Sequence, residues 1–182
     1  MDILFSADWK PLTSSSLLTA WQAQWLQDQG SLTQKIRQVC QHDLQVKVLI
    51  HQFIAAPAFT EKELHIEAGH ALLHREVLLC DGETPLVFAC SLLPEVALHG
   101  SYEALRELGN RPLGHWIFSE PILQRANMHY ASLPITNRLF QNLRHVMELS
   151  GSLCGRKTLF TGADKPFLVS EFFLPELQKR RP

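Results

Sequence analysis

The chain has 182 residues, 46% of them hydrophobic, which is enough for one domain with a sizeable core. Its 17 basic and 18 acidic residues give a formal net charge of -1, so the chain has no general positive field for nucleic acid or anionic lipid. An anionic ligand would need a local site. We expect a single domain over residues 1–182 that is a monomer and binds a small molecule, with no nucleic-acid partner.

Targeting signals are not visible in the sequence. The N-terminus has no basic segment followed by an apolar run, and nowhere do about 18 uncharged apolar residues follow one another, so we expect neither secretion nor a membrane span. Cys40, Cys80, Cys90 and Cys154 are far apart and form no C-x-x-C pair. This pattern is typical of reduced thiols and favours a cytoplasmic location.

The first 45 residues predict two helices. Residues 13–16 offer several N-cap candidates before an amphipathic helix over 17–26. Gly30 would end that unit, and Ser31 would cap a second helix reaching residue 42.

The middle of the chain predicts strands. Residues 46–54 are rich in β-branched side chains, and residues 71–80 and 86–93 flank the turn signal at 81–83 (DGE). The intervening polar stretch around residues 61–63 is read as a connection. We therefore predict an antiparallel hairpin.

The remaining segments mix both types. A cap, helix formers and a terminal glycine predict a short helix over 101–109, after which Pro112 and Gly114 oblige the chain to turn. We then expect strands over 122–132 and 155–160, with a helix over 137–150 between them. Strands with helices at intervals favour an α+β domain whose single antiparallel sheet is covered on one face by helices.

Residues 165–176 (KPFLVSEFFLPE) carry an unusual carboxylate. Read as a strand, whose side chains alternate between two faces, this segment places Glu171 on one face with Phe167, Val169 and Phe173. A lone buried carboxylate costs several kcal/mol unless it is protonated or paired. Glu171 therefore needs a partner or a function.

Arg75 is also a charged residue on an apolar strand face, because alternation places it with Leu73, Val77 and Leu79. Its guanidinium carries five donors in a planar fork suited to a carboxylate. Arg75 could pair with Glu171, reach solvent at a sheet edge, or join Glu171 in a ligand site. Burial would raise the pKa of Glu171 toward neutrality, whereas a neighbouring arginine would lower it, and the sequence leaves this balance open.

Other catalytic signatures are weak. The histidines, above all His65, His70 and His74, match no paired metal-ligand spacing, so we expect no metal. The sequence contains no G-x-S-x-G nucleophile motif, no glycine-rich dinucleotide loop and no P-loop, so we expect no nucleotide cofactor.

Three motifs in order resemble the chorismate lyase family: residues 73–83 (LHREVLLCDGE), 108–118 (LGNRPLGHWIF) and 165–175 (KPFLVSEFFLP). Residues 25–33 are similar to the family's N-terminal segment. The resemblance implies a cofactor-free lyase that converts chorismate into 4-hydroxybenzoate and pyruvate, the first step of ubiquinone biosynthesis. It also implies an antiparallel sheet of about six strands, with helices enclosing a buried ligand pocket.

The same resemblance assigns roles to four residues. Arg75 would hold the ring carboxylate with help from the backbone amide of Leu113, Glu171 would lie at the other end of the ring, and Leu32 would line the site from a mobile helical cover. One carboxyl group in a dry pocket could move the proton that the elimination requires, so we assign Glu171 the general acid/base role. An enclosed pocket predicts slow product exit and product inhibition.

Two other readings compete with this one. The family's fold also serves as the small-molecule sensing module of bacterial transcription regulators, but residues 1–45 contain no basic recognition helix, which disfavours a fused sensor. A related lyase that makes another hydroxybenzoate would show the same motifs. The helix predicted over 137–150 departs from the family pattern, as do the turn at 162–166 and His115.

Overall fold

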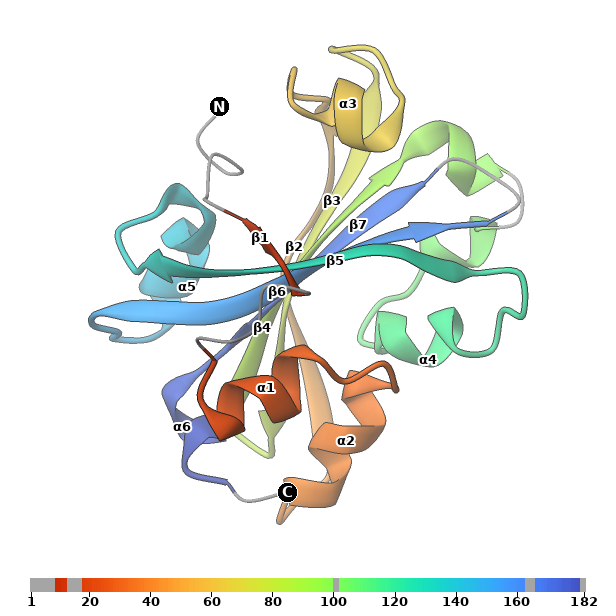
Figure 1. Ribbon diagram of the computed structural model, residues 1–182. Helices are drawn as coiled ribbons and strands as arrows, with labels where there is room; N and C mark the ends of the chain where they lie inside the picture. Colours follow the sequence, from red (N-terminus) through yellow and green to blue (C-terminus); the bar gives the residue numbers. More distant parts are fainter. Residues whose placement is uncertain (1–8, 13–17, 100–101, 163–165, 181–182) are drawn as a thin grey trace.

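A computed structural model describes residues 9–12, 18–99, 102–162 and 166–180, and its centre is one strongly twisted antiparallel sheet (Figure 1). The seven strands lie in the order β1-β5-β6-β7-β4-β3-β2. The predicted α+β class is confirmed, with a two-residue edge strand added to the expected six. The strands are β1 (Lys10–Pro11), β2 (Leu44–Ala55), β3 (Ala71–Asp81), β4 (Thr84–Pro94), β5 (Gln124–Pro134), β6 (Ser152–Thr161) and β7 (Phe167–Phe173).

The helices are short and lie between the strands in sequence. None in the described part of the chain is long and apolar enough to cross a membrane. The α-helices are α1 (Ala20–Leu26), α2 (Leu32–Val39), α3 (Thr60–Leu64), α4 (Leu113–Ile117), α5 (Gln141–Val146) and α6 (Pro175–Gln178). The 3-10 turns are η3 (Glu95–His99), η4 (Glu103–Leu105) and η5 (Arg138–Phe140).

The predicted hairpin is the central part of the sheet. β3 and β4 pair from Leu72 and Pro94 to Asp81 and Thr84, around Gly82 at a φ of 55°. That left-handed conformation favours glycine and suits a tight hairpin turn. β7 pairs with β4 on one side and β6 on the other, so the C-terminal strand lies next to the hairpin.

The N-terminal helices differ in length from the prediction. α1 begins at Ala20 because Thr19 and Gln22 form a capping box, each side chain accepting a hydrogen bond from the other's backbone N–H. The predicted caps at 13–16, together with Leu17, lie outside the described residues. Ser31 caps α2 as predicted, and α2 ends at Val39.

Two later assignments were wrong in detail. The helix expected over 101–109 is only the 3-10 turn η4, and Ser101 lies outside the described residues. The chain does turn just before Pro112, where the Arg111 N–H donates to the Leu108 carbonyl oxygen at 2.9 Å, and Pro112 is then the N-cap of α4. The helix predicted over 137–150 is split between η5 and α5 and ends at Val146, and α3 was missed.

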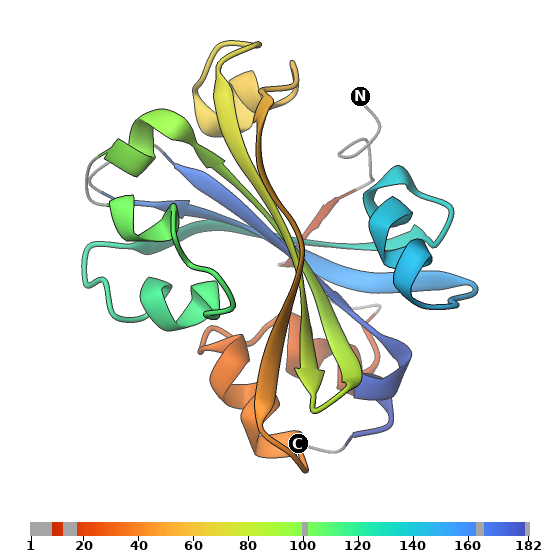
Figure 2. The ribbon, with the colours of Figure 1, turned by 180° about the vertical axis from the view of Figure 1, so that it is seen from behind.

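Helices pack on both faces of the sheet, not on one as predicted (Figures 1 and 2). The reason is that the side chains on both sides of β3, β4 and β7 are apolar and need cover. The face that includes Arg75 and Glu171, here called the cavity face, packs against α1, α2 and α4. The opposite face, here called the closed face, packs against α3, η5 and α5.

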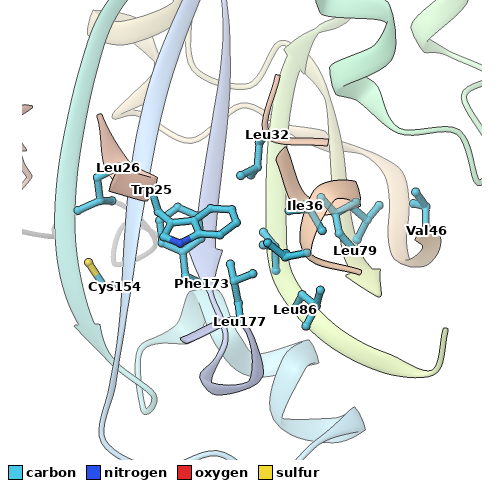
Figure 3. Close-up of a cluster of buried hydrophobic side chains, with 13 residues drawn as sticks. Trp25, Leu26, Leu32, Ile36, Val46, Leu79, Leu86, Cys154, Phe173 and Leu177 are labelled. Carbon is cyan, nitrogen blue, oxygen red and sulfur yellow. The ribbon is translucent and has the colours of Figure 1, made fainter. Parts of the chain in front are cut away.

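The hydrophobic cluster under α1 and α2 fixes these helices on the cavity face (Figure 3). Trp25, Leu26 and Ile36 are fully buried there, and Trp25 packs on the ring of Phe173 with centroids 5.9 Å apart. Burying side chains of this size contributes about 1.5–3 kcal/mol each. The helix pair and its connecting loop, residues 20–39, are called the cover below.

Candidate functional site

The four residues singled out in the sequence line one cavity on the cavity face. Arg75 comes from β3, Glu171 from β7, Leu32 from α2 and Leu113 from α4. The empty space at this site is about 540 Å³, which includes open solvent at the mouth of the cavity. The other lining residues are Thr33, Val77, Leu79, Ala89, Ser91, Gly114, Ile117, Phe118, Arg125, Phe160 and Val169.

The strand register separates the two charged groups. Arg75 is opposite Ser91 on β4, Ser91 is opposite Val169 on β7, and Glu171 lies two residues further along β7. With strands about 4.8 Å apart and a rise of about 3.4 Å per residue, the two Cα atoms are about 12 Å apart. Arg75 and Glu171 therefore face each other across the cavity and do not form the ion pair that was one of the sequence-based alternatives.

The Arg75 side chain is almost completely buried, with 1% of the residue exposed. Its Nη2 donates to the carbonyl oxygens of Gly109 at 3.0 Å and Arg111 at 3.1 Å, and its Nε has no hydrogen-bond partner among the described residues. Burial lowers the pKa of Arg75 to about 10. A buried cation with an unused donor is a site for an anion, since leaving such a donor unmet is costly.

The N-termini of α2 and α4 both lie at this cavity. Leu32 is the first residue of α2 and Leu113 the first of α4, where a backbone N–H has no acceptor within its own helix. The two helices meet closely, because a Cβ on Gly114 would lie 2.8 Å from the Oγ1 of Thr33. Only glycine fits at that contact without movement.

The partner of Glu171 is Arg156 on β6, which sequence reasoning missed. The two residues are direct cross-strand neighbours, and Arg156 Nε donates to Glu171 Oε2 at 2.6 Å. Arg156 is 1% exposed, and its Nη1 also donates to the carbonyl oxygens of Trp25 at 3.2 Å and Asp28 at 2.7 Å. Arg156 thus supplies the counter-charge for Glu171 and ties it to the cover.

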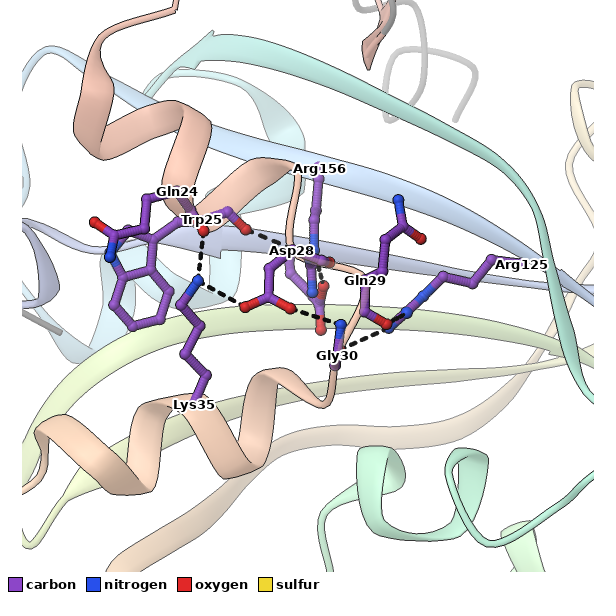
Figure 4. A network of polar contacts seen from close by, with 9 residues as sticks. Gln24, Trp25, Asp28, Gln29, Gly30, Lys35, Arg125 and Arg156 are labelled. Atoms are coloured by element: carbon purple, nitrogen blue, oxygen red, sulfur yellow. Dashed lines mark hydrogen bonds and ion pairs between the residues drawn. The ribbon is translucent and has the colours of Figure 1, made fainter.

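Arg125 on β5 is a further cation that the sequence did not reveal. Its Nη1 and Nη2 donate to the carbonyl oxygens of Gln29 and Gly30 in the cover, with the Gly30 contact at 3.0 Å (Figure 4). Its guanidinium lies over the rings of Phe118 and Phe160, at 4.9 and 5.6 Å from their centroids. The only signal in the sequence was an arginine within a mixed strand, and that signal is weak.

A second buried polar cluster lies on the closed face. His74 Nε2 is 3.0 Å from Glu76 Oε1, without hydrogen-bond geometry, and Asn142 Nδ2 donates to Glu76 Oε2 at 2.8 Å. His74, Glu76 and Cys90 have ligand-type atoms within 4.8 Å of one another, the one such group found in the described residues. His65 and His70 are not part of it. The sheet separates this cluster from the cavity.

Comparisons with known proteins agree with the motifs. A sequence profile described as chorismate lyase matches residues 3–181. A protein of Nitrosospira multiformis named "Probable chorismate pyruvate-lyase" is 33% identical over 172 residues, covering 94% of each chain. One of Psychromonas ingrahamii with the same name is 36% identical over 179 residues, covering 94% of this chain and 90% of the relative.

The fold is also similar to solved structures of transcriptional regulators. A GntR-family transcriptional regulator from Bacillus cereus matches 73% of this chain and 92% of its own, with a TM-score of 0.56 at 12% identity. At that identity the likeness shows the fold alone.

Proposed function

The chain belongs to the chorismate lyase family, and we propose on that basis that it converts chorismate into 4-hydroxybenzoate and pyruvate. The observation that carries the proposal is the pair of groups at the two ends of one cavity. Arg75 offers an unused donor and a positive charge at one end, and Glu171 offers a carboxylate at the other.

Arg75 binds the ring carboxylate of the substrate in this proposal. Its Nε faces no acceptor of the described chain, so a carboxylate satisfies both the donor and the charge. The backbone N–H of Leu113, free at the start of α4, is the second donor to the carboxylate, and Leu32 covers the ring from α2.

Glu171 moves the proton. In the reaction the bond between the ring and the enolpyruvyl oxygen breaks, and a proton leaves the neighbouring ring carbon, whose electron pair completes the aromatic ring. The departing enolpyruvate gains one proton and becomes pyruvate, so the atoms balance. Arg156 holds Oε2 of Glu171, which leaves Oε1 to exchange the proton with the substrate. Arg156 is a positioning residue in this scheme.

Movement of the cover would ease release. Leu32 and Thr33 of the cover line the cavity, and Arg156 and Arg125 fasten the loop between α1 and α2, so opening of these contacts widens the path by which 4-hydroxybenzoate leaves. Slow release and competitive inhibition by 4-hydroxybenzoate follow. Supply of 4-hydroxybenzoate to ubiquinone biosynthesis and a cytoplasmic location remain predictions.

The decisive experiment is incubation of the purified protein with chorismate in the absence of added metal and nucleotide. We expect pyruvate and 4-hydroxybenzoate in equal amounts. Binding of chorismate or hydroxybenzoate without pyruvate would instead favour a sensor-like domain of the same fold. Identifying the ring isomer by chromatography separates the proposed reaction from a lyase that makes another hydroxybenzoate.

A further inference from the structure

Arg125 is a cation of the cavity that the proposed chemistry has not used. It lines the cavity from β5, the strand farthest from Arg75 among those that contribute to the lining. Its Nε is buried and has no hydrogen-bond partner in the described chain. Its two other nitrogens reach the carbonyl oxygens of Gln29 and Gly30, which are neutral acceptors. The charge of Arg125 is therefore not neutralised by its contacts.

The charged groups around the cavity leave an excess of positive charge. Glu171 is paired with Arg156, and Asp28 in the cover is paired with Lys35 at 2.6 Å. Arg75 and Arg125 remain without an acidic partner in the described residues. Burial and the nearby charge of Arg156 lower the pKa of Arg125, and the more weakly acting Glu171 and Asp28 do not offset them. The cavity thus has places for two negative groups.

We propose that Arg125 binds a second carboxylate of the ligand, the one on the enolpyruvyl group, while Arg75 binds the carboxylate on the ring. This inference rests on the proposed function, since chorismate is a dicarboxylate and 4-hydroxybenzoate a monocarboxylate. Arg125 then distinguishes substrate from product. After the reaction its carboxylate partner is on pyruvate, while the aromatic product remains held by Arg75.

The contacts of Arg125 with the cover leave donors for a ligand. Of its five N–H groups, one on Nη1 and one on Nη2 reach the carbonyl oxygens of Gln29 and Gly30, so the Nε–H and a second Nη hydrogen remain for a carboxylate. The rings of Phe118 and Phe160 hold the guanidinium plane in place.

The test measures equilibrium binding of two ligands in a Glu171→Gln background, which prevents turnover. Adding Arg125→Gln should weaken chorismate binding roughly 10- to 100-fold, the usual effect of losing a charge-assisted pair, and change 4-hydroxybenzoate binding less than about 3-fold. Arg125→Lys, which keeps the charge, should restore part of the chorismate affinity. Arg37→Gln is the matched control, because Arg37 is an exposed cation of α2 that does not line the cavity.

If Arg125→Gln weakens the binding of chorismate and of 4-hydroxybenzoate equally, Arg125 only fastens the cover and the inference is overturned. Unchanged affinity for both ligands would also overturn it. Binding of chorismate is separate from its conversion. If the unmodified protein forms pyruvate but Arg125→Gln does not discriminate between the ligands, only this inference fails. If the unmodified protein forms no pyruvate, the proposed function fails whatever the binding data show.

Discussion

Arg75 and Glu76 are neighbours on β3, both nearly inaccessible to solvent, and they point to opposite faces of the sheet. On the closed face, Glu76 accepts a hydrogen bond from Asn142 and has the counter-group His74 at 3.0 Å, although His74 Nε2 makes no hydrogen bond among the described residues. On the cavity face, Arg75 bonds two carbonyl oxygens, has no acidic counter-group in the described chain and leaves Nε unmet. The unmet donor of Arg75 lines a cavity that a ligand can enter, whereas the Glu76 cluster does not line it.

The layers over the two faces are also fastened differently. On the closed face, Phe140 packs edge-on against Phe88 and Phe172, with ring centroids 5.9 and 4.9 Å apart. On the cavity face the loop between α1 and α2 is held mainly by charged side chains, among them Arg125, Arg156 and Lys35 (Figure 4). Packed side chains resist local opening, and α1 and α2 are themselves held by Trp25 and Ile36 in the core. The polar contacts of the loop between them can break and re-form, so the loop is the part of the cover that can open over a ligand.

Replacing Glu171 with Gln should have the largest effect on activity. The amide keeps the size of the side chain but cannot accept and return a proton, so we expect kcat to fall roughly 10²- to 10⁴-fold with much of the substrate binding retained. Steady-state pyruvate formation and direct chorismate binding measure the two effects. Unimpaired turnover by Glu171→Gln would refute the general acid/base assignment.

The matched control is Glu76→Gln on the closed face. It also removes a buried carboxylate, but one that does not line the cavity. We expect lower stability, by about 1–3 kcal/mol, and little change in kcat for the folded fraction.

Phe140→Ala tests the closed face. Phe140 is fully buried, and truncating a buried phenylalanine usually costs about 3–5 kcal/mol. Urea unfolding should show this loss, while the kcat of the protein that remains folded stays close to that of the unmodified chain. Phe53→Ala is the control, because Phe53 on β2 is 44% exposed and its loss should change stability far less. A kcat that falls in proportion to stability would mean that the two faces are not independent.

The sequence predicted the sheet and both ends of the cavity because these depend on local signals. The hairpin is set by β-branched runs around Asp81 and Gly82, and alternation along β3 and β7 places Arg75 and Glu171 on one face. Ser31 as a cap follows from the same kind of local chemistry.

The partners of these residues depend on register between distant segments, and sequence reasoning did not find them. Glu171 meets Arg156 only because β6 pairs with β7 in one register, and Arg125 meets Gln29 through a fold contact across 96 positions of the chain. The expected helix over 101–109 failed for a related reason. Leu105 and Leu108 are both buried in the cluster under α4, and the carbonyl oxygen of Gly109 accepts a hydrogen bond from Arg75, so contacts with distant segments shape this stretch.

Asp28→Asn tests the polar fastening of the cover and should have the smallest effect. The Asp28 carboxylate lies 2.6 Å from Lys35 Nζ and accepts the Gly30 N–H at 2.6 Å. Burial alone would raise the pKa of Asp28, but these two contacts prevail and lower it from its usual value of 3.8. A carboxylate with a lowered pKa in the folded state stabilises the fold above pH 3.8, and this stabilisation is lost as the pH falls through the folded-state pKa.

We therefore expect Asp28→Asn to reduce the unfolding free energy by about 0.5–1 kcal/mol near neutral pH, and by less as the pH falls below 3.8. Urea unfolding of the unmodified protein and of Asp28→Asn, at neutral pH and at a pH below 3.8, measures the difference. Glu176→Gln, which removes a more exposed ion pair with Lys179, should have almost no effect at either pH. The loss caused by Phe140→Ala should be the same at both pH values, because no titrating group takes part in the aromatic packing of the closed face. A pH-independent loss for Asp28→Asn would mean that the loop between α1 and α2, too, is held by packing rather than by charge.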